Sequence, residues 1–324
     1  MPDSTLFILV ILLAVGFAVI NGFNDAANAI ATVIGTRVLS PLRAVIMAAI
    51  FNFAGAATGL AVALTIGKGI VAPEFLDYDV MLAALAAVII WGGIATRFGL
   101  PISISHSFIA GLVGAAIAAA GSVAIVWETF TKVLSSVAIA PALGFAGGLS
   151  VMVALMWLLR RKAPLRVEGI FSRLQIISAA FMAYSHGKND GQMPIGIMAM
   201  ALVIHTGNEF QVPFWVIALS ATAISLGTAF GGWRVIKTVG TRITALRPVQ
   251  GFAAMSSAAT VVEIASSFGI PVSTTHCISS SIMGVGATKR LSAVRWGVAG
   301  NIVLAWILTF PICGIIGWVL GSIL

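Results

Sequence analysis

The sequence predicts an all-α polytopic membrane protein, an inverted-topology repeat with broken and re-entrant helices and about 10–12 membrane segments. Three observations lead to this fold class. Hydrophobic residues make up 60% of the 324 positions and charged residues only 9%, and the mean hydropathy is +1.09. Two polar motifs each occur twice inside apolar stretches. Basic and acidic loops alternate along the chain.

The repeated motifs divide the chain into two related halves. Residues 22–28 read GFNDAAN and residues 187–191 read GKNDG, while residues 99–106 read GLPISISH and residues 269–276 read GIPVSTTH. Asp25 and Asp190 lie 165 positions apart, and His106 and His276 lie 170 positions apart. Two nearly equal spacings indicate an internal duplication of about half the chain, the arrangement found in many secondary transporters.

Apolar segments long enough to cross a bilayer follow one another from end to end. In the first half they are predicted at 5–36, 42–70, 80–98, 101–125 and 133–159, and in the second half at 174–204, 212–233, 248–268, 271–287 and 296–322. A basic connector at 160–173 separates a first repeat, 1–159, from a second repeat, 174–324.

Loop charge gives these segments an orientation. Basic residues gather at Arg37 and Arg43, in the connector 160–173, at 234–247 and at 289–295, whereas Glu74, Asp77, Asp79, Glu128 and Glu209 lie in the loops between them. The positive-inside rule places the basic loops in the cytoplasm and both termini outside, in a multi-pass protein of the plasma membrane. Five crossings in each half then force the second repeat to insert upside down. Because loop position accounts for the net charge of +8, nucleic acid is excluded as a partner.

Four segments do not fit plain spans. As one helix, 5–36 would be about 48 Å long, and it carries Asn24 and Asp25 in its middle. We therefore expect a helix break there and another in the matching segment around Asp190. The segments that begin at Pro101 and Pro271 are expected to be re-entrant or discontinuous helices with proline in the first turn. Irregular backbone at membrane depth is tolerated only where it lines a cavity.

The Asn-Asp motifs suggest a site for the coupling cation. An aspartate inside the membrane is costly and is by default a functional hypothesis. Carboxylate and amide oxygens suit Na⁺, so the predicted sodium ligands are Asp25, Asn24, Asn28, Asp190 and Asn189. A bound cation also removes the penalty of a buried bare carboxylate.

The Pro-led motifs suggest an anion site. Hydroxyl groups beside helix N-termini combine hydrogen-bond donors with the positive end of the helix dipole. The predicted anion ligands are Ser103, Ser105, Ser107, Ser273, Thr274 and Thr275.

Several other polar residues keep more than one interpretation. For His106 and His276 we favour hydrogen bonding that locks the re-entrant turn over proton handling or metal binding. Lys188 either helps to hold an anion or neutralises Asp190, and Glu263 has no evident partner.

These motifs resemble the paired signatures of the inorganic phosphate transporter (PiT) family. The stretches 22–29 and 186–192, the Pro-x-Ser-x-Ser/Thr-His pair and the stretch 231–236 carry the resemblance, which covers essentially the whole chain. It implies phosphate uptake coupled to a cation, an inverted repeat and often a homodimer. The chain lacks the long central hydrophilic loop of some eukaryotic members and has Met193 where the first motif has Asn28.

The predicted function is import of inorganic phosphate by symport with Na⁺, through alternating access and without a covalent cofactor. The family resemblance also allows an H⁺-coupled carrier of phosphate or metal–phosphate, or a sulfate transporter. An intramembrane serine hydrolase is disfavoured, because each polar element occurs twice and no Gly-x-Ser-x-Gly elbow is present. Discontinuous helices with paired acidic sites also suit alternating access better than an open channel.

Overall fold

The computed structural model describes residues 3–324, and these residues form helices joined by short loops, with one antiparallel bridge between Val71 and Ile125. The helices are α1 (Asp3–Gly35), α2 (Pro41–Ala56), α3 (Ala61–Lys68), α4 (Tyr78–Phe98), α5 (Ile104–Ala120), α6 (Trp127–Leu159), α7 (Pro164–Asp190), α8 (Gln192–Thr206), α9 (Phe214–Phe230), α10 (Trp233–Lys237), α11 (Pro248–Ser267), α12 (Thr274–Ala287) and α13 (Trp296–Gly321). Short helical turns lie at η1 (Pro73–Phe75), η2 (Ser122–Ala124), η3 (Thr238–Arg242) and η4 (Leu291–Ala293).

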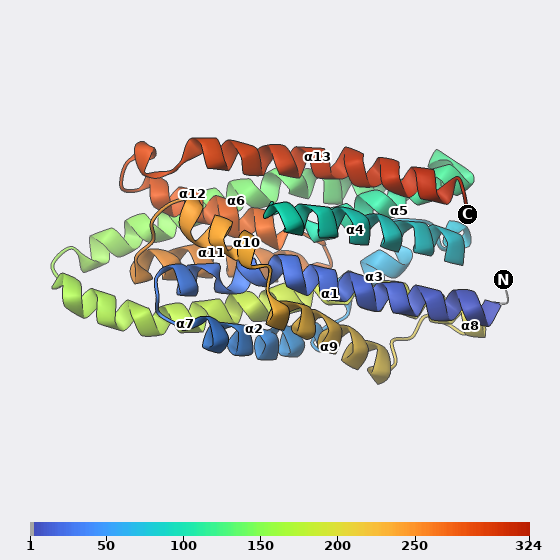
Figure 1. Cartoon of the computed structure of the whole chain (residues 1–324), viewed down its shortest axis with the longest axis horizontal. Helices are drawn as coiled ribbons and strands as arrows, with labels where there is room; N and C mark the ends of the chain where they lie inside the picture. The colour runs from blue at the N-terminus through green and yellow to red at the C-terminus, as the bar shows by residue number, and fades with distance from the viewer. Residues whose placement is uncertain (1–2) are drawn as a thin grey trace.

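Most helices run along the long axis of the molecule, and both termini lie at the same end (Figure 1). The basic loops meet at the opposite end, which we call the basic face. There Arg160, Lys162 and Arg247 line one pocket, and Arg295 N–H donates to the carbonyl of Ile243 at 2.9 Å. The end that carries the termini and the Val71–Ile125 bridge is called the acidic face.

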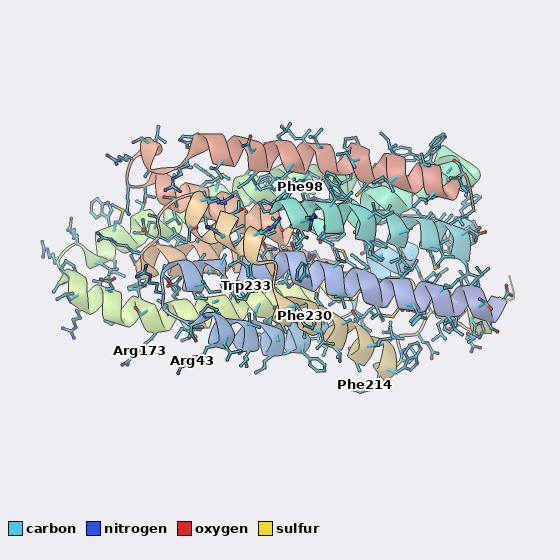
Figure 2. The ribbon with its side chains drawn as sticks, viewed as in Figure 1. Arg43, Phe98, Arg173, Phe214, Phe230 and Trp233 are labelled. Carbon is cyan, nitrogen blue, oxygen red and sulfur yellow. The ribbon has the colours of Figure 1, made fainter. Side chains whose placement is uncertain are left out.

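Exposed apolar side chains cover the flanks between these two faces. Phe98, Phe214 and Phe230 are 72%, 78% and 69% exposed, and Figure 2 shows them along the length of the molecule, with Arg43 and Arg173 toward the basic face. Four helices are long and apolar enough to cross a bilayer, namely α1, α4, α6 and α13, and six are if α2–α3 and α9–α10 with η3 each count as one bent span. Such flanks are suited to lipid, and the chain is a multi-pass membrane protein.

The same sequence of elements occurs twice. Helices α2 and α3 meet at 66°, and the pair formed by α9 with Trp233–Arg242 meets at 63°. Pro141 inside α6 and Pro311 inside α13 lie 170 positions apart. The predicted division into repeats at 1–159 and 174–324 agrees with this order and stays a prediction. The connector predicted at 160–173 is helical from Pro164 onward, because Pro164 opens α7.

The break predicted at Asn24 and Asp25 is wrong, because α1 is one uninterrupted helix of 33 residues. The polar side chains of this region bond sideways to other helices, and the backbone of α1 has no need to open. In the second half the helix is interrupted at one residue only: α7 ends at Asp190 and α8 begins at Gln192, and Gly191 between them keeps helical backbone angles. Two further breaks, between α2 and α3 and between α9 and α10, lie inside segments that were predicted as single spans.

The segments predicted to be re-entrant belong to helical hairpins, formed by α4 with α5 and by α11 with α12. Each hairpin turns through a left-handed glycine, Gly99 at φ 69° and Gly269 at φ 70°. Pro101 and Pro271 lie in short extended segments ahead of the helices, and not in the first turn as predicted. Ser103 and Ser273 are the N-caps, since each hydroxyl oxygen accepts from the backbone N–H three residues on, at 3.1 Å.

The two halves interlock. Helix α5 packs along α13 and α12 packs along α6, while α1 packs on α9 and α7 on α2. Glycines allow the closest approaches: a Cβ at Gly22 would overlap the carbonyl of Ile224, and a Cβ at Gly187 would overlap that of Asn52. Close contact through small residues is how membrane helices gain packing energy without a hydrophobic driving force.

Candidate functional site

One face of α1 carries a row of buried polar side chains. Asn21, Asn24, Asp25 and Asn28 recur at spacings of three and four residues, which places them on one helix face, and each is at most 1% exposed. The Asn24 amide donates to the Thr96 hydroxyl at 2.7 Å, and the Asn28 amide donates to Thr274 and Thr275 at 3.0 Å each. The Oδ1 atoms of the three asparagines have no partner within residues 3–324. This row therefore offers unused amide oxygens beside a carboxylate.

The end of α7 presents the second polar set. The Asn189 amide donates to the Val272 carbonyl at 2.7 Å, and its oxygen accepts from Val272 N–H at 3.3 Å and from the Ser266 hydroxyl at 3.2 Å. Asn189 thereby holds the extended segment that precedes α12. The next residue, Asp190, ends the helix and is fully buried.

Each carboxylate accepts a hydrogen bond from a hydroxyl group in the hairpin of the other half. Thr275 of α12 donates to Asp25 at 3.0 Å, and Ser105 of α5 donates to Asp190 through a short hydrogen bond. Asp190 also accepts from Thr274 at 3.2 Å, from Asn189 at 3.2 Å and from Asn21 at 3.4 Å. The two Asn-Asp motifs and the two Pro-led motifs thus form one cluster.

The two carboxylates lie close together, and no Lys or Arg side chain of residues 3–324 neutralises them. One ligand atom each from Asp25, His186 and Asp190 lies within 4.8 Å of the others, and His186 Nε2 is 3.9 Å from Asp25 Oδ2 and 3.7 Å from Asp190 Oδ2. No Lys or Arg of residues 3–324 pairs with either aspartate. Two unit charges 4.8 Å apart repel by about 3.5 kcal/mol at an effective dielectric constant of about 20. This cluster therefore favours a cation.

The six hydroxyls predicted to bind phosphate fall into two groups. Ser105, Thr274 and Thr275 face the carboxylates, as described above. The other three serve their own helices: Ser103 and Ser273 are N-caps, and the Ser107 hydroxyl donates to the Ser103 carbonyl at 2.7 Å. Only the first group has its donor directed at the polar cluster.

The histidines of the Pro-led motifs do not lock the turns through their rings, contrary to our favoured interpretation, since the N-cap serines do so. The rings of His106 and His276 lie 5.1 Å apart, and His276 stacks on Trp306 at 4.1 Å. Neither ring nitrogen of His106 has a hydrogen-bond partner within the described chain. The pair packs at the junction of the two hairpins.

Lys188 neutralises Glu263 and not Asp190. Its ammonium group forms a short ion pair with Glu263 and donates to the Ser267 hydroxyl at 3.3 Å. The two side chains are 16% and 26% exposed, so the pair lies outside the buried cluster and gives Glu263 the partner that the sequence did not reveal.

Two residues of the site, and one that supports a nearby helix break, were not among the predicted ligands. Asn21 and His186 precede the two aspartates by four residues each, and they lie 165 positions apart like the aspartates themselves. Extending the motif comparison by one helical turn would have found them. Gln192, which accepts from Val62 and Ala63 N–H at 2.9 and 3.3 Å and donates to the Thr58 carbonyl at 3.1 Å, bridges the α2–α3 break.

Comparison with known proteins supports a transporter. Residues 21–317 match the phosphate transporter family. A probable low-affinity inorganic phosphate transporter of Rhizobium meliloti (strain 1021) is 46% identical over 321 residues, covering 97% of this chain and 96% of that protein. One of the same description from Bacillus subtilis (strain 168) is 43% identical, covering 96% and 95%.

A solved structure described as the sodium-dependent phosphate transporter has the same fold. It superimposes with a TM-score of 0.88 at 29% identity and covers 98% of both chains. The predicted all-helical transporter fold is thereby confirmed, and the resemblance seen in the motifs is confirmed by the family match. Together these findings show a membrane transporter and not an enzyme, and the chain belongs to the phosphate transporter family.

Proposed function

We propose that this protein imports inorganic phosphate across the plasma membrane by symport with Na⁺. The observation that carries the proposal is that a hydroxyl from the hairpin of the other half bonds each buried carboxylate. No Lys or Arg of residues 3–324 pairs with either of these two neighbouring carboxylates. A phosphate anion cannot enter such a cluster unless cations offset the carboxylates. The solved relative described as sodium-dependent favours Na⁺ as that cation.

In this proposal the cation ligands are Asp25 and Asp190 with the free amide oxygens of Asn24 and Asn28. Those oxygens have no partner within residues 3–324, and hard cations bind oxygen ligands. Asn189 belongs to the same site, where its amide holds the backbone ahead of α12.

The hydroxyls link the cation to the anion. Ser105, Thr274 and Thr275 now donate to the carboxylates, and one hydroxyl hydrogen cannot serve carboxylate and phosphate at once. When Na⁺ takes over the carboxylates, these hydroxyls and the free N–H groups at the starts of α5 and α12 become available to phosphate. Ser103, Ser107 and Ser273 hold the two helix starts in position. Sodium and phosphate should then tighten each other's binding by the same factor.

One observation favours the alternative in which phosphate transport is coupled to protons. His186 lies within 4 Å of both carboxylates, and His is the side chain that most readily exchanges a proton near neutral pH. The same three groups could instead hold a divalent metal that travels with phosphate. Either would make Na⁺ dispensable.

Radiolabelled phosphate uptake into proteoliposomes separates these cases. We expect uptake driven by an inward Na⁺ gradient, little uptake in choline, and loss of the Na⁺ effect in Asp25→Asn. Ser279→Ala is the matched control, because Ser279 is a buried hydroxyl of α12 without a partner in residues 3–324. Equal uptake in Na⁺ and choline, with a response to a pH gradient, would reject the sodium proposal, and preference for radiolabelled sulfate would reject phosphate as the substrate.

A further inference from the structure

A cavity lined by apolar side chains and two arginines lies apart from the carboxylate cluster. It has a volume of about 380 Å³ and opens where the tip of the α4–α5 hairpin meets the α9–α10 break. Phe23, Thr96, Arg97, Trp233 and Arg234 line it together with Gly231 and Gly232. In Figure 2, Trp233 lies nearer than Phe230 to the end that carries Arg43 and Arg173, so the chain that lines the cavity leads on toward the basic face.

Two guanidinium groups in this cavity lack a counter-ion. Arg97 and Arg234 are both exposed, and no carboxylate of residues 3–324 pairs with either of them. Arg234 donates to the backbone carbonyl of Arg97, which holds the two residues at the same opening. A cavity lined by two unpaired positive charges favours an anion, and the planar guanidinium fork matches phosphate oxygens.

The cavity adjoins the buried cluster. Thr96, next to Arg97 in the chain, accepts a hydrogen bond from Asn24 at 2.7 Å, and Asn24 immediately precedes Asp25. Only the Thr96–Asn24 pair therefore separates the cavity wall from the residue that carries the first carboxylate.

The matching position of the second repeat, within residues 3–324, has no such free positive charge. In the register of the repeat, Arg97 corresponds to Ser267, Gly93 to Glu263 and Phe23 to Lys188. There the ammonium group of Lys188 is neutralised by Glu263 and bonded to Ser267. The matching position of the second repeat thus carries a neutralised ion pair, whereas Arg97 and Arg234 have no carboxylate partner within residues 3–324.

We propose that the Arg97–Arg234 cavity is a second binding site for inorganic phosphate, which receives the anion on its way from the carboxylate cluster to the basic face. This inference rests on the proposed function. Once the cations leave, the carboxylates of Asp25 and Asp190 repel phosphate. The two guanidinium groups supply compensating positive charge, and because they are exposed to solvent they hold phosphate weakly enough to release it.

Phosphate binding to the purified full chain, measured by calorimetry in NaCl and in choline chloride at equal ionic strength, tests the site. We expect a Na⁺-dependent class of binding and a weaker class that persists in choline. Arg97→Gln should weaken the second class at least tenfold and leave the first unchanged, since the Arg97 side chain makes no hydrogen bond within residues 3–324. Arg234→Gln should act likewise. Lys237→Gln, which removes an exposed charge from the same short helix outside the cavity, is the matched control.

The measurement distinguishes this site from the central one. Asp25→Asn should abolish the Na⁺-dependent class and keep the class that persists in choline. If the sodium proposal itself fails, the wild type lacks the first class while the choline measurement still reports on the arginines. A wild type without binding in choline, arginine variants that behave like Lys237→Gln, or displacement by chloride as effective as by phosphate would each overturn the second site.

Discussion

Replacing Asp25 with asparagine removes one of two carboxylates whose ligand atoms lie within 4.8 Å of each other. The substitution keeps the local hydrogen bond, because the amide oxygen still accepts from Thr275. Without Na⁺, the wild type bears a repulsion of about 3.5 kcal/mol at an effective dielectric constant of about 20. The sodium-free variant should therefore be more stable than the sodium-free wild type, by up to this amount.

In the presence of Na⁺, the wild type should become the more stable of the two proteins. A ligand present at about 100 times its Kd stabilises the folded state by about 2.7 kcal/mol, which the wild type gains and Asp25→Asn does not. Thermal unfolding of detergent-solubilised protein in choline chloride and then in NaCl measures both effects, with Ser279→Ala expected to follow the wild type. A variant that is no more stable than wild type in choline, or that still gains from Na⁺, would refute the reasoning.

Three further substitutions have distinct expected results. Asp190→Asn removes the same carboxylate repulsion as Asp25→Asn, but its new N–H₂ faces hydroxyl and amide donors that now bond the carboxylate, at a cost of about 1–3 kcal/mol. Its unfolding temperature in choline should therefore lie below that of Asp25→Asn, and equal unfolding temperatures of the two variants would contradict this. Gln192→Ala should destabilise by a similar amount, since it strips the N–H groups of Val62 and Ala63 of their acceptor, and the sodium response should survive in the same thermal assay. Gly187→Val should reduce the yield of folded protein measured by size-exclusion chromatography, as its side chain would enter the α2 backbone, whereas Gly169→Val, with open space around its Cβ, should not.

The sequence was most informative where polar residues recur inside apolar segments. Asp25, Asp190 and the hydroxyls of the Pro-led motifs could be placed in one site, because burying them is costly and their spacing repeats. Helix breaks were harder to predict. Asn24 and Asp25 were predicted to break a helix. In α1, however, their side chains form hydrogen bonds with neighbouring helices, and the backbone stays helical.

The helix breaks between α2 and α3 and between α9 and α10 are marked less clearly in the sequence than the polar motifs are. Gly59 and Gly231 adopt left-handed conformations, at φ 81° and 60°, but each lies in an apolar stretch that reads as one span. Tertiary contacts decide these positions: Gln192 from α8 supplies the acceptor for the N–H groups at the start of α3. A partner that lies more than a hundred residues away cannot be found from local pattern.

The exchange of partners between the halves has an evolutionary consequence. Asp25 accepts a hydrogen bond from Thr275 and Asp190 accepts one from Ser105, so neither half alone supplies all the contacts of its carboxylate, although Thr274 of the same half also bonds Asp190. A half-length ancestor with these motifs would have needed two copies inserted in opposite orientations to close the same contacts. Such dual insertion requires loops with little charge bias. The asymmetric arginines and lysines of the present chain would then have accumulated after gene fusion, when each half acquired a fixed orientation.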